Sequence, residues 1–339
     1  MPVDAPQRYR GRFAPSPTGP LHFGSLVAAM ASYCDARSQR GDWLVRIEDV
    51  DEPRSRPDAE SDIVATLARY GFRWDETIVR QSQRTAHYDE ALASLRRGDR
   101  VYDCVCTRRE LEAAPIGSGG ERVYPGTCRH GVDNARRLMS AAGPPQGAHC
   151  TPLVDRAAAY EMANEAASVG AHNRAPAVRF RVDETLIEYA DRLFGSQHQR
   201  LTNDVGDFVV KRADGLFAYQ LAVVVDDALQ RITDVVRGVD LIASTPRQIA
   251  LQRALGFPQP RYLHLPIAVD ARSRKLSKQT NAPPLPHDPL PALATAWRFL
   301  DQPMAIASPR TLDDFWSHAT ASWTPSRLPP VSMLPVPRA

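Results

Sequence analysis

The first hundred residues alternate between short apolar runs and amphipathic stretches. The apolar runs predict strands at 9–13, 43–49, 77–82 and 101–106. The amphipathic stretches predict helices over 25–40, 60–72 and 88–99. Gly41 directly follows the first of these helices and is a typical stop signal. Strands that alternate with helices in this way predict an α/β fold with a Rossmann-like, doubly wound parallel sheet.

The same alternation resumes after residue 176. A strand is predicted at 177–182, and 207–229 reads as two strands joined by a turn at Asp214-Gly215. Further signals predict a strand with a loop in 231–244 and a strand at 262–270. Between them lies a predicted helix, 245–257, with Thr245 as N-cap and Pro246 in its first turn.

Residues 107–176 interrupt this rhythm with Gly-Pro-rich stretches and an alanine-rich segment. We therefore predict four parts: 1–103 and 177–270 as the two halves of the Rossmann-type domain, 104–176 as an insertion, and 271–339 as a basic loop with short helices and a tail. Twelve of the 29 prolines lie after residue 280, so the tail is expected to be loosely ordered.

Charge and hydropathy narrow the class of protein. The 42 Lys and Arg residues nearly balance the 39 Asp and Glu residues, which excludes a strongly basic protein that coats DNA. The mean hydropathy is −0.36, and no run approaches the roughly 18 apolar residues of a membrane span. The N-terminus lacks the apolar segment of a secretory signal, so a cytoplasmic protein that does not interact with membranes is expected.

The segment that joins the first strand to the first helix carries candidate phosphate chemistry. It contains His22-Phe-Gly24-Ser25, and the helix begins there. A helix N-terminus presents unpaired N–H groups and a partial positive charge, which favour phosphate binding. Gly24 would let a charged ligand approach the backbone, although the same pattern alone also suits an ordinary helix cap.

A second candidate is the basic loop Lys275-Leu-Ser-Lys278-Gln279, about 250 residues further on. Alone it would be a solvated charge run. The two stretches together, in this order, resemble the HIGH and KMSKS motifs of the class I aminoacyl-tRNA synthetases. The resemblance implies that His22, Lys275 and Lys278 are catalytic. It also implies that His22, Gly24, Ser25 and Lys278 bind ATP, which is accompanied by Mg²⁺.

Other stretches resemble the glutamyl branch of that class. They are the run from Arg12 to Gly19, the string Arg46-Ile-Glu48-Asp49, and the segments around Tyr219 and Arg237. A substrate carboxylate needs a fixed guanidinium, and arginine offers bidentate geometry. The resemblance implies a glutamate pocket with either Arg12 or Arg237 on the side-chain carboxylate and Glu48 near the ammonium. Its implied residues are Arg12, Phe13, Ala14, Pro15, Ser16, Glu48, Tyr219 and Arg237.

Three cysteines of the insertion suggest one structural zinc ion. Cys104 and Cys106 end a predicted strand, and Cys128 follows 22 residues after Cys106. On chemistry alone His130 is the better fourth ligand, because a tyrosine must lose a proton of pKa about 10. The family pattern instead implies Tyr124, so the expected set is Cys104, Cys106, Tyr124 and Cys128, with His130 as the alternative. Three reduced thiols without metal are the plainer interpretation.

Only 60 residues follow Gln279, too few for a helical anticodon-binding domain. Over 8–130 and 177–300 the chain therefore resembles the glutamyl-Q tRNA(Asp) synthetase family. This resemblance implies a monomeric ligase that activates L-glutamate with ATP, releasing AMP and pyrophosphate. It then transfers glutamate to the queuosine base at the wobble position of tRNA(Asp), a tRNA modification.

Two other functions compete with this interpretation. A truncated glutamyl-tRNA synthetase would charge a tRNA 3′ end, and a non-catalytic RNA-binding paralogue would do no chemistry. Binding alone would not require both His22 and the two lysines, which argues against the paralogue. A Rossmann dehydrogenase is disfavoured because no Gly-x-Gly-x-x-Gly follows the first strand.

Overall fold

The structure is a computed structural model. It describes residues 8–51, 53, 55–112, 114–117, 120–132, 175–270, 272–276, 282–303 and 309–337. The chain forms two compact units. The first unit consists of 1–89, 187–199 and 220–339, and the second of 90–186 and 200–219. Within the described part of the chain, no helix is both long and apolar enough to cross a bilayer.

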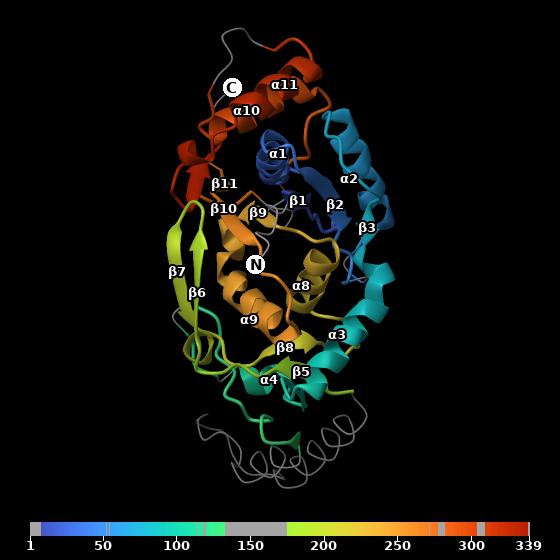
Figure 1. Cartoon of the computed structure of the whole chain (residues 1–339), viewed down its shortest axis with the longest axis vertical. Coiled ribbons are helices and arrows are strands. Elements are labelled where there is room, and N and C mark those ends of the chain that lie inside the picture. The colour runs from blue at the N-terminus through green and yellow to red at the C-terminus, as the bar shows by residue number, and fades with distance from the viewer. Residues whose placement is uncertain are drawn as a thin grey trace, which may run out of the picture. The chain divides into compact units, whose positions relative to one another are not determined.

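Parallel strands form the centre of the first unit (Figure 1). β1 pairs with β2, and β2 pairs with β3. β10 lies between β9 and β6 and is parallel to both. The amide of Thr233 donates to the carbonyl of Arg10 over 2.9 Å, so the chain entering β9 lies beside β1. These strands are β1 (Arg10–Phe13), β2 (Asp42–Ile47), β3 (Val79–Arg80), β6 (Leu186–Asp191), β9 (Asp234–Gly238) and β10 (Arg261–Leu265).

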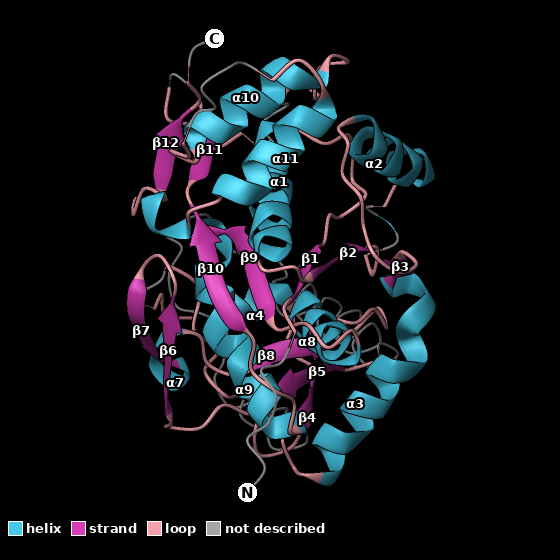
Figure 2. Ribbon diagram, turned by 45° about the horizontal axis from the view of Figure 1, so that its top comes forward, coloured by secondary structure: helices cyan, strands magenta, loops and turns pink. Residues whose placement is uncertain are grey.

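Helices cover this sheet as the alternating pattern predicts. α1 (Phe23–Ser38) packs against β1, β2 and β9 and also against α10 and α11, as Figure 2 shows. Its buried face completes an aromatic cluster in which Tyr33 meets Trp43, Phe72 and Trp316 with ring centroids 4.8–5.4 Å apart. The remaining helices are α2 (Pro57–Arg69), η2 (Gln81–Arg84), α3 (Thr85–Arg97), α8 (Tyr219–Leu229), η3 (Val239–Ser244), α9 (Thr245–Leu255), α10 (Pro289–Phe299), α11 (Leu312–Ser322) and η5 (Pro325–Arg327).

The short helices expected in 271–339 are present as α10 and α11, which bury Trp297, Phe315 and Trp316 in the core of the first unit. The Pro-rich end is not loosely ordered in its described part, so that expectation was wrong. β12 (Met333–Pro335) pairs in parallel with β11 (Ile267–Val269). Proline is compatible with these elements because it sits in first helical turns and at the end of an edge strand.

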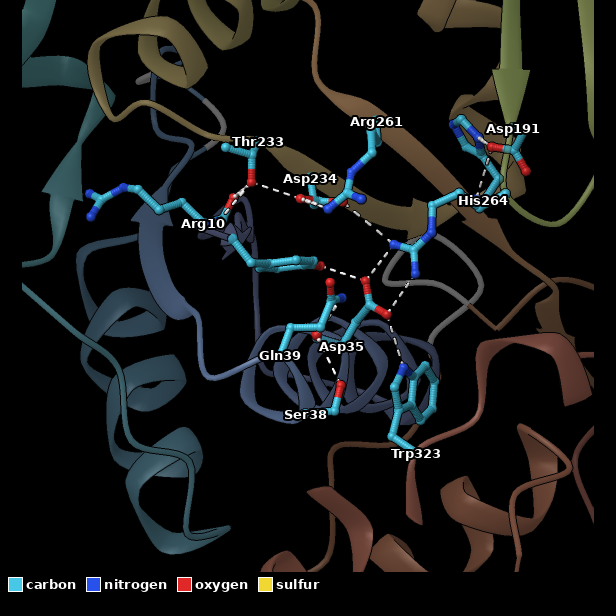
Figure 3. A network of polar contacts seen from close by, with 12 residues as sticks. Arg10, Asp35, Ser38, Gln39, Asp191, Thr233, Asp234, Arg261, His264 and Trp323 are labelled. Carbon is cyan, nitrogen blue, oxygen red and sulfur yellow. Dashed lines mark hydrogen bonds and ion pairs between the residues drawn. The ribbon is translucent and has the colours of Figure 1, made fainter. Parts of the chain in front are cut away.

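A buried carboxylate joins several of these elements (Figure 3). Asp35 of α1 accepts hydrogen bonds from Tyr9 at 2.5 Å, Trp323 at 3.0 Å and both terminal nitrogens of Arg192 at 2.6 and 2.9 Å. All of its acceptor sites are thereby used, as a buried carboxylate requires. Asp35 thus connects the helix with the end of β6 and with the C-terminal segment.

The second unit is built differently. Its strands β4 (Val101–Cys104), β5 (Ala177–Phe180) and β8 (Phe208–Lys211) form an antiparallel sheet, with two short helices, α4 (Arg108–Leu111) and α7 (Leu201–Asp204). The prediction of a parallel sheet therefore holds for the first unit and was wrong for this one. The alanine-rich stretch and Cys150 lie outside the described residues.

Three local predictions were wrong. The second strand expected in 207–229 is the helix α8, in which residues 220–227 are all buried and include a run of β-branched valines that favours a strand. The N-cap of α9 is Ser244, and Thr245 is already helical. β6 and β7 (Gly195–Arg200) were not predicted, although buried and exposed residues alternate along β6 as they do in a half-buried strand, whereas β7 consists mainly of polar residues.

Candidate functional site

The N-terminus of α1 lies beside Leu276, which belongs to the described start of the basic loop 275–279, called the lysine loop below. His22 caps the helix, with its Nδ1 accepting from the amide of Ser25 at 3.4 Å. A Cβ on Gly24 would lie 3.2 Å from the His22 ring and 3.4 Å from the carbonyl oxygen of Leu276. Beyond the loop, the amide of Leu285 donates to the carbonyl of Leu21 over 3.0 Å. The described segments on both sides of 277–281 therefore contact the start of this helix.

The structure describes one of the two lysines that are predicted to be catalytic. Lys275 forms an ion pair with Asp240, with Nζ 2.7 Å from Oδ2, and its side chain is 42% exposed. Lys278 lies outside the described residues. Ser25 is the third residue of α1, and its amide is the N-terminal N–H group that the His22 ring caps.

Arg12 lies at the carboxyl end of β1 and forms a buried, bidentate ion pair. Its Nε and Nη2 donate to the two oxygens of Asp227 over 3.1 and 3.4 Å. Arg46 of β2 approaches the same carboxylate at 2.8 Å. Burial raises the pKa of Asp227, but Arg12 and Arg46 outweigh this and hold it below its usual value. Asp227 therefore stays ionised between two guanidinium groups.

Glu48 follows β2 directly, and its amide donates to the carbonyl of Pro15 over 3.0 Å. Its carboxylate lies 3.4 Å from Nη2 of Arg46. Burial raises the pKa of Glu48, although Arg46 and Arg12 lower it. Glu48 and the Arg12–Asp227 pair thus belong to one charged cluster at the carboxyl ends of β1 and β2, where open α/β sheets bind ligands.

Arg237 of β9 bonds to an imidazole and to a hydroxyl. Its Nε donates to Nε2 of His264 over 3.1 Å, and its Nη2 donates to the hydroxyl of Thr245 over 2.8 Å. Its guanidinium carbon lies 5.6 Å from the ring centre of Tyr262. Burial raises the pKa of Tyr262 to about 12, and the charges of Arg237, Asp227 and Arg12 all act on this phenol. Both predicted pocket arginines therefore lie near Tyr262.

The other predicted pocket residues are placed in different surroundings. Phe13 stacks on Trp43 at 6.3 Å and belongs to the core, so only its backbone is accessible to a ligand. Ala14 and Pro15 continue the chain beyond β1, and Ser16 is exposed. Tyr219 is the first residue of α8 and groups with the second unit.

Sequence reasoning missed the residues that hold these arginines. No role was predicted for Asp226 and Asp227, His264 was assigned only to the strand expected at 262–270, and no element was predicted at Asp191. A signal was available for Asp227, since a charged residue within an apolar run must have a buried partner. For His264 no such signal existed, because its partners lie 27 and 73 residues away.

The three predicted cysteines come together in the second unit. The sulfur atoms of Cys104, Cys106 and Cys128 lie within 4.8 Å of one another, the last two 3.5 Å apart. The phenol oxygen of Tyr124 lies 3.4 Å from the sulfur of Cys104 and 3.5 Å from that of Cys106. Hydrogen bonds from Cys106 and Cys128 lower the pKa of Cys104, as does nearby Arg179. His130 is exposed and does not belong to this group.

Comparison with known proteins shows the family of this chain. The family model for the catalytic domain of class I tRNA synthetases (E and Q) matches residues 8–144 and 145–284. The glutamyl-Q tRNA(Asp) synthetase of Dechloromonas aromatica is 47% identical over 97% of this chain and 98% of its own. That of Burkholderia mallei is 49% identical over 93% and 96%. The chain belongs to the glutamyl-Q tRNA(Asp) synthetase family.

Solved structures agree with this assignment at the level of fold. A glutamate tRNA ligase from Elizabethkingia meningosepticum, determined in complex with its amino acid, superposes with a TM-score of 0.72. At 23% identity the match covers 98% of this chain and 67% of that one. Membership in the glutamyl-Q tRNA(Asp) synthetase family makes the chain a ligase of class I, for which ATP is a substrate accompanied by Mg²⁺.

Proposed function

We propose that this chain activates L-glutamate with ATP and transfers the glutamyl group to queuosine in tRNA(Asp). The observation that carries the proposal is the contact between the two motif segments, where the carbonyl of Leu276 faces Gly24 at the start of α1. A nucleotide triphosphate bound there would meet helix N–H groups, His22 and the lysine loop together. The names of the relatives supply the acceptor.

Each predicted residue has a role in this reaction. The α-carboxylate of glutamate attacks the α-phosphorus of ATP, and pyrophosphate leaves. His22, Gly24 and Ser25 face the phosphates, while Lys275 and Lys278 stabilise the charge that develops on them, together with Mg²⁺. The glutamate carboxylate side chain binds Arg12 or Arg237, and the ammonium lies near Glu48. The backbone of 13–16 completes the pocket, to which the family resemblance adds Tyr219.

The role of Lys278 is tested by Lys278→Ala. We expect ATP–pyrophosphate exchange with glutamate to fall by about a hundred- to thousandfold. Lys211→Ala is the matched control, because Lys211 lies in the second unit against the ring of Phe217. Equal exchange rates in both variants would remove Lys278 from the mechanism.

The acceptor is tested with labelled glutamate and tRNA that either contains or lacks queuosine. Label is expected only on queuosine-containing tRNA(Asp), and it should survive removal of the terminal adenosine. Label lost with that adenosine would identify the enzyme as a truncated glutamyl-tRNA synthetase. Absence of glutamyl-adenylate at any substrate concentration would support the non-catalytic RNA-binding alternative.

We also propose that Cys104, Cys106, Cys128 and Tyr124 hold one structural zinc ion. A tetrahedral site with zinc–sulfur distances of about 2.3 Å has sulfur–sulfur separations of about 3.8 Å, close to the 3.5 Å between Cys106 and Cys128. The ion would fix the loop between β4 and Cys128. Metal analysis should give one zinc per chain, lost in Cys106→Ser and weakened in Tyr124→Phe, whereas His130→Ala should retain it.

The fourfold division of the chain and its monomeric state belong to the same proposal. A monomer is supported by the pairing of both motif segments within one chain, so no second copy is needed to complete the site. Sedimentation of the active enzyme at micromolar concentration should give a mass near 37.5 kDa.

A further inference from the structure

A buried histidine connects Arg237 to a carboxylate on another strand. His264 of β10 is fully buried, and its Nδ1 lies 2.7 Å from Oδ2 of Asp191, the last residue of β6 (Figure 3). Its other ring nitrogen, Nε2, faces Nε of Arg237 at 3.1 Å. The three side chains therefore form a line from β6 through β10 to β9.

The chemistry of the partners fixes the tautomer of this histidine. An arginine Nε–H can only donate, so Nε2 of His264 must offer its lone pair. The proton is then on Nδ1, which donates to Asp191. The hydroxyl of Thr245 accepts from Arg237 over 2.8 Å and lies 3.3 Å from Nε2. This arrangement is satisfied only by a neutral imidazole.

Asp191 is itself fixed in place. Its Oδ1 accepts from the amides of Leu193 and Phe194 over 3.0 and 2.9 Å, which closes the turn from β6 into β7. The next residue, Arg192, forms the bidentate contact with Asp35 in α1. The carboxylate that orients His264 is thus anchored to the turn and, through its neighbour, to the first helix.

We infer that Asp191 and His264 form a positioning pair that sets the orientation of the Arg237 guanidinium toward the side-chain carboxylate of glutamate. Because bidentate recognition of a carboxylate depends on the plane of the guanidinium, the residue that fixes that plane contributes to selection of the substrate. The inference rests on the proposed function, since it assumes that Arg237 binds glutamate.

A dependence on pH follows from the surroundings of His264. It faces Asp191 from β6, Arg237 from β9, Asp240 from η3 and Thr245 from α9, and it stacks on Tyr262 at 6.2 Å. Burial lowers the pKa of His264, as does the cation of Arg237, against an opposing effect of Asp191. Protonation would place an N–H on Nε2, opposite the N–H of Arg237. Glutamate binding should therefore weaken at acid pH.

The test compares His264→Gln with His264→Leu. The glutamine oxygen can occupy the place of Nε2 and accept from Arg237, whereas leucine has no acceptor. Leucine should raise the KM for glutamate in pyrophosphate exchange about ten- to hundredfold, with the KM for ATP and kcat changed less than about threefold. In His264→Gln, the KM for glutamate should stay within about threefold of that of the unmodified enzyme. In the same variant, kcat/KM for glutamate should no longer fall at acid pH.

Arg237→Lys separates failure of this inference from failure of the proposed function. If Arg237→Lys raises the KM for glutamate and His264→Leu does not, the positioning role is wrong while the proposed pocket stands. If neither changes it, Arg237 does not bind glutamate. If His264→Leu fails to fold by circular dichroism, His264→Gln decides: an unchanged acid-side profile in that variant overturns the inference.

Discussion

Two arginines at neighbouring strand ends are held in opposite ways. Arg12 is clamped by a carboxylate, Asp227, which also meets Arg46 and lies within a cluster of buried charges. Arg237 donates hydrogen bonds to the imidazole of His264 and to the hydroxyl of Thr245. The carboxylate of Asp191 bonds to the other side of that imidazole. A carboxylate partner neutralises the guanidinium that it orients, whereas an imidazole and a hydroxyl orient a guanidinium without neutralising it. We expect the contacts of Arg12 to serve mainly the stability of the fold, and those of Arg237 to serve mainly the binding of the glutamate carboxylate.

The largest effect is expected when the carboxylate that Arg12 and Arg46 share is removed. Asp227→Asn would leave Arg12 and Arg46 buried without their shared anion, and we expect a loss of about 3–5 kcal/mol in the free energy of unfolding. Urea denaturation measures it. Asp313→Asn is the control, since its pair with Arg73 is 80–90% exposed and should contribute less than about 1 kcal/mol. Similar midpoints for the two variants would show that the buried cluster is not a clamp.

Exchanging each arginine for lysine sharpens the comparison. Lysine cannot form the bidentate pair, so Arg12→Lys should lower the free energy of unfolding by about 1–3 kcal/mol. Arg237→Lys should lower it less but should raise the KM for glutamate about tenfold or more. Thermal melts and pyrophosphate exchange on both variants give the two readouts. The opposite ranking in either measurement would reverse the assignment of roles.

The two regions should also lose stability in different pH ranges. The folded pKa of His264 is lowered, so between that value and its ordinary value of about 6.5 the unfolded chain binds a proton that the folded chain does not. Stability should therefore fall as the pH drops below about 6.5, by at most about 1.4 kcal/mol per pH unit. His264→Gln should lack this component. Asp227, whose folded pKa is also lowered, contributes its loss only below about pH 4.

The smallest effect is expected at Thr245. Thr245→Val removes the hydroxyl that accepts from Nη2 of Arg237 and leaves His264 in place. A neutral hydrogen bond of about 1 kcal/mol corresponds to an increase of about fivefold in the KM for glutamate. Thr320→Val, on a hydroxyl that bonds only within α11, provides the matched control. A larger effect than that of His264→Leu would make the hydroxyl, and not the imidazole, the main support.

The two halves of this comparison also differ in how far the sequence predicted them. The strands and helices around Arg12 follow from periodicity, and the turn before α1 was found from Pro, Gly and the helix start. The Arg237 region depends on β6, a short strand whose last residue, Asp191, is polar and yet buried. Its link through His264 joins residues that are distant in sequence, and local patterns carry no information on such pairs.

The helix α8 is a second case in which local sequence patterns did not predict the structure. Its run of three valines favours a strand by local propensity, yet the segment is helical because it is enclosed on every side. The position of Asp227, and with it the clamp on Arg12, depends on that helix. Tertiary surroundings therefore decided a part of the site that propensity alone assigned wrongly.

The pairing of β12 with β11 has a structural consequence. β11 runs directly into the residues that precede the lysine loop, and Leu276 returns to hydrogen-bond with Ala268 in the middle of that strand. A change in the pairing of β12 would therefore be expected to reach the strand against which Leu276 is bonded.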